Sequence, residues 1–188
     1  MRKYLKDIGI KSRIAFKNLS EISYVKRNKI LETFSKELFK NKKKIIKENE
    51  KDIKLCKRQD LIDRLLLDNN KIENIRNSLD EIKKFRDPLG KILSSWKRPN
   101  GLKIKKVSIP IGVIAVIYES RPDVTPYVSA LCIKSGNVAI LRGGSEAYFS
   151  NYIFSNLFRN ALKKNHINQN CIQFINKKNR KIVDHLLS

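Results

Sequence analysis

The feature that most restricts the fold of this chain is an uninterrupted apolar run in its second half. Residues 112–118 read Gly-Val-Ile-Ala-Val-Ile-Tyr, and four of the seven are β-branched. A strand with one face in water would alternate apolar and polar side chains, whereas this run has no polar position between its glycine and its tyrosine. It is also about half the length that a membrane-spanning helix needs. The run therefore predicts a strand covered on both faces, as in a parallel sheet.

The segments that follow predict a complete α/β unit. Residues 124–134 have a helical pattern, and residues 138–141 form a second short apolar run. A long helix to about Lys164, a third strand over residues 172–175 and a short helix from about Lys178 complete the pattern. Strands that alternate with helices predict an α/β fold with a parallel sheet and right-handed crossovers.

The first half of the chain predicts helices. Apolar residues recur at helical spacing from about Leu5 to Phe85, and neither glycine nor proline occurs between Ile10 and Asp87. Asp68 is placed to cap one of these helices. After Gly101 the pattern becomes nearly alternating, which predicts a strand over residues 102–109.

The net charge of +23 has two interpretations. One is an anionic partner such as nucleic acid. The other is compositional drift, because the chain holds 29 Lys against 12 Arg, with 18 Asn and 25 Ile, all types with A/T-rich codons except Arg. Phosphate and base recognition favour the planar guanidinium of Arg, so the excess of Lys favours drift. The residues alone leave both interpretations open.

The cysteines and the N-terminus indicate a compartment. Cys56, Cys132 and Cys171 are odd in number, far apart and without metal-ligand spacing, so neither a disulfide framework nor a metal site is expected. The N-terminus lacks the apolar segment of a signal peptide. We expect a cytoplasmic protein with no membrane partner.

Two turns at predicted strand ends are candidates for chemistry. The first covers residues 118–125 and reads Tyr-Glu-Ser-Arg-Pro-Asp-Val-Thr. It is either a capping loop, with Asp123 as the N-cap and Arg121 paired to Glu119, or the edge of a site where Asp123 and backbone N–H groups face a reacting carbonyl.

The second turn covers residues 142–146 and reads Arg-Gly-Gly-Ser-Glu. Two glycines between a buried strand and a helix allow the backbone to approach a ligand, and a helix N-terminus favours anions. A tight turn without a ligand is the alternative, since the sequence has neither dinucleotide-fingerprint nor P-loop spacing. Ser145 is placed to cap the helix that follows.

At these turns the chain closely resembles the gamma-glutamyl phosphate reductases, the proline-pathway branch of the aldehyde dehydrogenase superfamily. The resemblance rests on residues 109–125, on residues 130–137 (Ala-Leu-Cys-Ile-Lys-Ser-Gly-Asn) and on residues 141–147 (Leu-Arg-Gly-Gly-Ser-Glu-Ala). It extends to Leu-Ile-Asp-Arg-Leu at residues 61–65 and to Asp-Pro-Leu-Gly at residues 87–90. It implies an enzyme that reduces gamma-glutamyl phosphate with NADPH to glutamate 5-semialdehyde, through attack of a cysteine thiolate on the acyl phosphate.

The resemblance also implies a role for each turn. Asp123 matches the oxyanion-hole position, although a carboxylate must be protonated to donate a hydrogen bond there. Arg142 matches the lysine that reaches the adenosine ribose, and Ser145 replaces the acid that would repel a 2′-phosphate, which favours NADP(H). The expected cofactor-binding residues are Glu119, Ser120, Arg121, Arg142, Gly143, Gly144, Ser145 and Glu146.

The main departure from the family is that no cysteine of this chain matches the nucleophile. The resemblance therefore implies an α/β protein with N-terminal helices and a partial Rossmann-like parallel sheet, truncated before the catalytic domain. The expected parts are an N-terminal helical part of the cofactor-binding domain over residues 1–100, a bridging strand of the oligomerisation type over residues 101–110, and a partial Rossmann-like NADP-binding domain over residues 111–188.

Two hypotheses follow for the activity. The chain is either the N-terminal part of the reductase or a non-catalytic remnant or split subunit that needs a C-terminal partner. The expected partners are the small-molecule substrate and either a second copy of the chain or a complementing C-terminal chain. On this resemblance we expect no nucleic-acid partner, so the charge is attributed to drift.

Overall fold

The computed structural model describes residues 2–177, 179 and 181–187, and it begins with a series of helices. These helices are α1 (Arg2–Ser20), α2 (Tyr24–Lys40), α3 (Lys42–Leu55), the single-turn α4 (Ile62–Leu65) and α5 (Asn69–Lys84). The carboxylate of Asp68 accepts a hydrogen bond from the backbone N–H of Lys71 at 2.6 Å. The predicted cap at Asp68 is thus confirmed.

The second half contains the predicted parallel sheet. The strands β3 (Val113–Ile117), β4 (Val138–Arg142) and β5 (Ile172–Phe174) lie side by side in that order, and both pairs are parallel. The helices α6 (Val124–Lys134) and α7 (Tyr148–Lys164) make the crossovers, and α8 (Lys181–Leu187) follows β5. Every residue of β4 is buried, because this strand has a neighbour on each side and helices on both faces.

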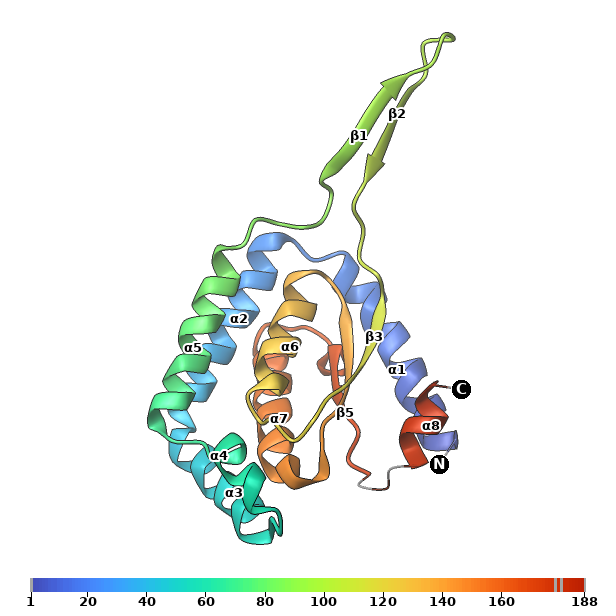
Figure 1. Cartoon of the computed structure of the whole chain (residues 1–188). Helices are drawn as coiled ribbons and strands as arrows, with labels where there is room; N and C mark the ends of the chain where they lie inside the picture. Colours follow the sequence, from blue (N-terminus) through green and yellow to red (C-terminus); the bar gives the residue numbers. More distant parts are fainter. Residues whose placement is uncertain (1, 178, 180, 188) are drawn as a thin grey trace.

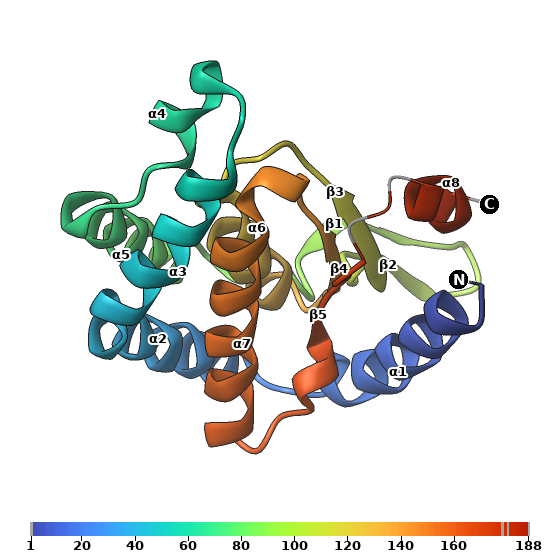
Figure 2. The ribbon, with the colours of Figure 1, turned by 90° about the horizontal axis from the view of Figure 1, so that it is seen from below.

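Helices cover the sheet in layers. Figure 2 shows α1 on one face of the sheet and α6 with α7 on the other, with α2, α3 and α5 outside α6 and α7. The main apolar core lies between these layers, where the rings of Phe34 and Phe158 pack with centroids 4.3 Å apart. The α/β fold with N-terminal helices that the sequence predicted is thus confirmed.

The largest difference from the sequence prediction is an antiparallel hairpin that extends away from the body (Figure 1). It consists of β1 (Ile92–Lys97) and β2 (Lys103–Val107). The sequence predicted a strand only at residues 102–109, and residues 92–97 fell within the part expected to be helical. The exposed β1 has no apolar periodicity, because the hairpin packs on no core that would impose it. The pairing register shifts between Ile92 and Ser94.

Two helix starts also differ from prediction. A 3-10 turn at Ser145–Ala147 precedes α7, and the side chain of Ser145 does not cap this helix. Instead, the carboxylate of Asp52 on α3 accepts hydrogen bonds from the backbone N–H groups of Phe149 at 3.0 Å and Ser150 at 2.8 Å. The short helix expected from about Lys178 begins at Lys181, and residue 178 lies outside the described residues.

Within the described part of the chain, none of the helices is long and apolar enough to span a membrane. The same residues contain no cluster of three or more His, Cys, Asp or Glu side chains that could hold a metal ion.

Candidate functional site

A pocket of about 590 Å³ lies at the carboxyl ends of β3 and β4, where parallel sheets commonly bind ligands. The loop after β3 forms one wall and the turn after β4 forms the other. All eight residues expected to bind cofactor line this pocket: Glu119, Ser120, Arg121, Arg142, Gly143, Gly144, Ser145 and Glu146. The fold therefore brings together the two turns that the sequence singled out, although they are more than twenty residues apart.

The two glycines are required by close contact within the protein. A Cβ atom at Gly144 would lie 2.7 Å from the backbone N and 2.9 Å from the Cα of Ser120. A Cβ at Gly143 would lie 2.9 Å from the ring of Tyr118. Neither glycine has a positive φ, so their use here is steric rather than conformational. The sequence left open whether a ligand or a tight turn requires these glycines, and in the structure side chains and backbone of the protein itself occupy the space beside them.

Ser120 and Glu146 connect the two turns. The Ser120 hydroxyl donates a hydrogen bond to Oε2 of Glu146, and the Ser145 hydroxyl donates to Oε1 at 3.2 Å. The hydrogen bond from Ser120 is the main cause that lowers the pKa of Glu146 below its ordinary value, and partial burial opposes it. Ser120 was expected to bind cofactor, and in the structure its side chain holds the two walls of the pocket together.

The pocket carries a net positive charge. Four arginines line it against two glutamates: Arg58, Arg64, Arg121 and Arg142 against Glu119 and Glu146. Arg142 is almost buried and donates a hydrogen bond to the carbonyl oxygen of Gly143. Guanidinium groups stay charged at all physiological pH values, so the pocket favours an anionic ligand.

A buried chain of hydroxyls supports the loop after β3. The Tyr118 hydroxyl lies 2.6 Å from Oγ1 of Thr125, which in turn donates to Oδ1 of Asn151 at 2.8 Å. Burial raises the pKa of Tyr118 to about 12. Tyr118 is therefore a neutral positioning group at physiological pH, and it does not act as a base.

The predicted pairing in the first turn is wrong. Arg121 does not pair with Glu119; its guanidinium lies 3.8 Å from the carboxylate of Asp123. Glu119 is 82% exposed and lies 4.0 Å from Arg64 instead. Asp123 occupies the position before α6 but makes no side-chain capping hydrogen bond. Asp123 lines a second, smaller pocket and is not among the residues that line the first one.

Some residues that line the pocket come from segments distant in sequence, and the sequence did not predict them. Arg58 and Leu61 come from the segment between α3 and α4, and Val183 comes from α8. Asn49 on α3 accepts a hydrogen bond from the backbone N–H of Leu67 at 2.8 Å and donates to the carbonyl oxygen of Leu65 at 2.8 Å, which ties the end of α4 to α3. No local pattern marks such residues, since their proximity depends on how α3 packs against α7.

None of the three cysteines lines either pocket. Burial raises the pKa of the Cys132 thiol to about 11 and that of Cys171 to about 12, so both stay protonated. Cys56 is half-buried and its thiol donates to Arg58 O. None of the three thiols is therefore placed to act as a nucleophile at the pocket.

Comparison with known proteins identifies the relatives of this chain. No protein-family model matches it. The gamma-glutamyl phosphate reductase of Desulforapulum autotrophicum is 41% identical over 187 residues, which is 97% of this chain and 45% of that protein. The gamma-glutamyl phosphate reductase of a Hydrogenobaculum strain is 42% identical over 193 residues, which is all of this chain and 44% of that protein.

Solved structures agree with these matches. The crystal structure of gamma-glutamyl phosphate reductase from Thermotoga maritima superposes with a TM-score of 0.94 at 33% identity, over 97% of this chain and 45% of that one. The chain is thus similar, over nearly its whole length, to part of the gamma-glutamyl phosphate reductases. The reductase from Saccharomyces cerevisiae superposes with a TM-score of 0.85 at 28% identity, over 92% of this chain and 46% of that one.

More distant structures confirm the wider fold. An acetylating aldehyde dehydrogenase from Geobacillus thermoglucosidasius superposes over 99% of this chain with a TM-score of 0.71 at 13% identity. The chain thus has the aldehyde dehydrogenase fold over its described residues. It spans about 45% of the length of the reductases that it matches, consistent with the N-terminal part that the sequence indicated.

Proposed function

We propose that this chain forms the NADP(H)-binding part of a gamma-glutamyl phosphate reductase, which reduces gamma-glutamyl phosphate to glutamate 5-semialdehyde in proline biosynthesis. The observation that carries this proposal is the positively charged pocket at the carboxyl ends of β3 and β4, in a chain matched over nearly its whole length by these reductases. The match supports the reaction, and the pocket supports the cofactor.

The donors that line the pocket fit a phosphorylated dinucleotide. Arg58 offers a guanidinium group to the pyrophosphate, and Arg142 is the residue assigned to the adenosine ribose. Ser145 offers a neutral hydroxyl where an acid would repel a 2′-phosphate, which favours NADP(H) over NAD(H). When bound, the dinucleotide supplies the hydride for the reduction. The backbone of residues 119–121 lines the cofactor cleft in this proposal.

The chain's own contribution to the chemistry is binding and positioning. An ionised carboxylate has no hydrogen-bond donor, so the oxyanion role proposed for Asp123 requires its protonated form. No thiol of this chain is placed to attack an acyl phosphate, so the nucleophile has to come from a part of the enzyme other than this one. This observation keeps the second hypothesis in place, in which the chain is non-catalytic until a C-terminal partner completes it.

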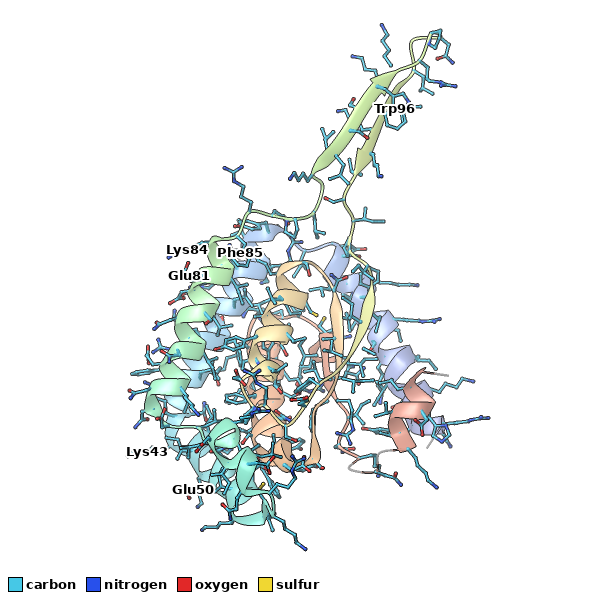
Figure 3. All side chains as sticks on the ribbon, viewed as in Figure 1. Lys43, Glu50, Glu81, Lys84, Phe85 and Trp96 are labelled. Atoms are coloured by element: carbon cyan, nitrogen blue, oxygen red, sulfur yellow. The ribbon has the colours of Figure 1, made fainter. Side chains whose placement is uncertain are left out.

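We further propose that the β1–β2 hairpin is an assembly arm for a homo-oligomer. Ile92, Leu93 and Trp96 are about half exposed on it, and Figure 3 shows Trp96 far from the helical body. Large apolar side chains gathered on an arm with no core of its own are typical of an interaction surface.

A complementation experiment tests the proposed function. The chain is co-expressed with the C-terminal remainder of the Thermotoga maritima reductase, and the reverse reaction is followed as NADPH formation from glutamate 5-semialdehyde, NADP and phosphate. We expect activity from the pair and none from either part alone. A complex that forms without activity would favour the non-catalytic hypothesis. No binding of NADPH to the chain, alone or in the complex, would contradict the cofactor assignment.

A further inference from the structure

A second pocket, of about 320 Å³, shares two lining residues with the cofactor pocket. Arg64 and Arg121 line both pockets and therefore form the boundary between them. The rest of its wall comes from the segment before α5, from the first turns of α5 and from α6, including Asp63, Leu67 and Tyr127. Its volume lies at the lower end of the range for small-molecule sites.

Charges of both signs face this pocket. Asp63 and Asp123 supply carboxylates, while Arg64, Arg121 and Lys71 supply cations. Lys71 is used within the protein, because its Nζ donates to the carbonyl oxygens of Asp63 at 2.9 Å and Leu66 at 2.8 Å. These bonds fix the wall that carries Asp63 without using the Asp63 carboxylate.

The charged groups in the pocket are only partly engaged. Among the described residues, the Asp63 carboxylate has no hydrogen-bond or ion-pair partner in the structure. The two arginines make only long ion pairs, at 4.0 Å from Arg64 to Glu119 and at 3.8 Å from Arg121 to Asp123. Three of these four side chains are more than half exposed, and pairs of this length contribute little there, so a ligand can replace them at small cost.

We propose that this second pocket binds the zwitterionic amino-acid end of the substrate. The α-ammonium group is placed at the Asp63 carboxylate, and the α-carboxylate is placed at the guanidinium groups of Arg64 and Arg121. The Asp63 carboxylate and the two guanidinium groups are complementary to a group with one positive and one negative charge, and the second carboxylate, Asp123, lies beside Arg121. The inference rests on the proposed function, since it identifies the substrate by its free amino-acid end.

The wall shared by the two pockets would orient the bound substrate. A ligand held by its amino-acid end in the second pocket would extend its other end along Arg64 and Arg121 towards the cofactor pocket. Asp63 and Arg64 are thus specificity-determining residues, which select an acyl group attached to an amino acid over a simple dicarboxylate or amine. The resemblance to the reductases includes both residues but assigns them no role.

The test compares three ligands that differ by one charged group. Amide spectra of the ¹⁵N-labelled chain are titrated with L-glutamate, with glutarate, which lacks the ammonium group, and with 4-aminobutyrate, which lacks the α-carboxylate. We expect saturable shifts at residues 63–74 and 121–127 with L-glutamate, and about tenfold weaker binding of the other two. Asp63→Asn should lower the affinity for L-glutamate about tenfold, to that of glutarate, and leave the affinity for glutarate unchanged. Asp7→Asn, an exposed carboxylate on α1 paired with Lys11, is the matched control and should change neither affinity.

Three outcomes would overturn the inference: no shifts with L-glutamate up to about 50 mM, shifts at other residues, or equal affinity in Asp63→Asn. NADPH is titrated separately and should shift residues 119–121 and 142–146. If NADPH causes no shifts while L-glutamate does, the result counts against the cofactor assignment and not against the proposal for this pocket. In the complementation complex, Asp63→Asn should raise the KM for glutamate 5-semialdehyde about tenfold with kcat changed less than about twofold, a split that a folding defect does not produce.

Discussion

The closest approach in the site is between Gly144 and Ser120, and it makes Gly144→Ala the most informative single substitution. The added Cβ would lie 2.7 Å from Ser120 N and 2.9 Å from Ser120 Cα, and it would also meet Ser120 Oγ. The Oγ atom can rotate away, but only by breaking its hydrogen bond to Glu146. The two backbone atoms cannot move without displacing the whole loop after β3.

The contact geometry gives the magnitude. Ordinary van der Waals contact begins at 3.4 Å, so the loops after β3 and β4 must separate by about 0.7 Å. Overpacking of this kind costs about 1–3 kcal/mol. The hydrogen bond from Ser120 to Glu146 adds little beyond this, since Glu146 is partly exposed and water can replace its partner. We therefore expect the free energy of unfolding to fall by about 2 kcal/mol, and the affinity for NADPH to fall about tenfold because both walls of the cofactor pocket move.

The fall in the free energy of unfolding is measured by urea titration, in which circular dichroism monitors the loss of helix. Fluorescence of Trp96 is unsuitable, because Trp96 lies on the hairpin and not in the helical body (Figure 3). Gly9→Ala is the matched control: a Cβ at Gly9 meets nothing within 4 Å, and Gly9 lies inside α1, so this change should stabilise the chain by about 0.5–1 kcal/mol.

A double variant separates the parts of the clash. Adding Ser120→Ala to Gly144→Ala removes only the clash with Oγ and should recover a minor share of the loss, because the backbone atoms of Ser120 remain. If Gly144→Ala unfolds within about 0.5 kcal/mol of the unchanged chain and binds NADPH equally well, the close approach does not explain the glycine.

The remaining predictions concern other contacts of the site and the hairpin. Asp52→Ala should lower the free energy of unfolding by about 2–4 kcal/mol, because the N–H groups of Phe149 and Ser150 lose a buried acceptor; urea unfolding measures it, and a loss below about 1 kcal/mol would contradict the capping role. The pKa of Glu146 is lowered in the folded chain, so its contribution to stability is present above its ordinary pKa of 4.5 and is lost as the pH falls through the lower folded value. Between about pH 6 and about pH 3, the free energy of unfolding of Ser120→Ala should therefore fall less on acidification than that of the unchanged chain. If the two free energies fall equally with pH, the hydrogen bond from Ser120 is not the cause of the lowered pKa. Ser145→Glu should weaken the binding of NADPH about tenfold or more relative to that of NADH, as measured by fluorescence titration. An unchanged ratio of the two affinities would show that Ser145 does not lie at the 2′-phosphate. Trp96→Ser should dissociate the proposed oligomer in sedimentation velocity while leaving the circular dichroism of the body unchanged, and unaltered sedimentation would exclude this side chain from the interface.

Much of the fold could be predicted because its signals are local. The apolar run at residues 113–117 became β3, and residues 124–134 became α6 with the predicted bounds. Burial on both faces removes polar residues from a strand, and that absence is visible without knowing what covers it. The Asp68 cap was equally predictable, since a capping side chain acts within its own turn.

Residues whose partners are distant in sequence were mispredicted. Glu119 was assigned to Arg121, its near neighbour, but it faces Arg64 from another segment. Ser145 looked like the cap of α7, a role that Asp52 takes from a different helix, 97 residues away from Phe149. The strand β1 gave no pattern at all, because an exposed hairpin has no buried face to impose one.

The sequence by itself determined the order of strands and helices, the position of the two turns and the resemblance to the reductases, because each depends on residues that are consecutive in the chain. Only the tertiary structure decided how the two turns contact each other. It placed Gly144 against Ser120, joined Ser120 to Glu146, and put Arg64 and Arg121 in the wall shared by two adjoining pockets. The physical reason is that hydrogen bonds, steric contact and charge pairing act over a few ångströms in space, and a linear sequence does not record which distant residues lie within that range.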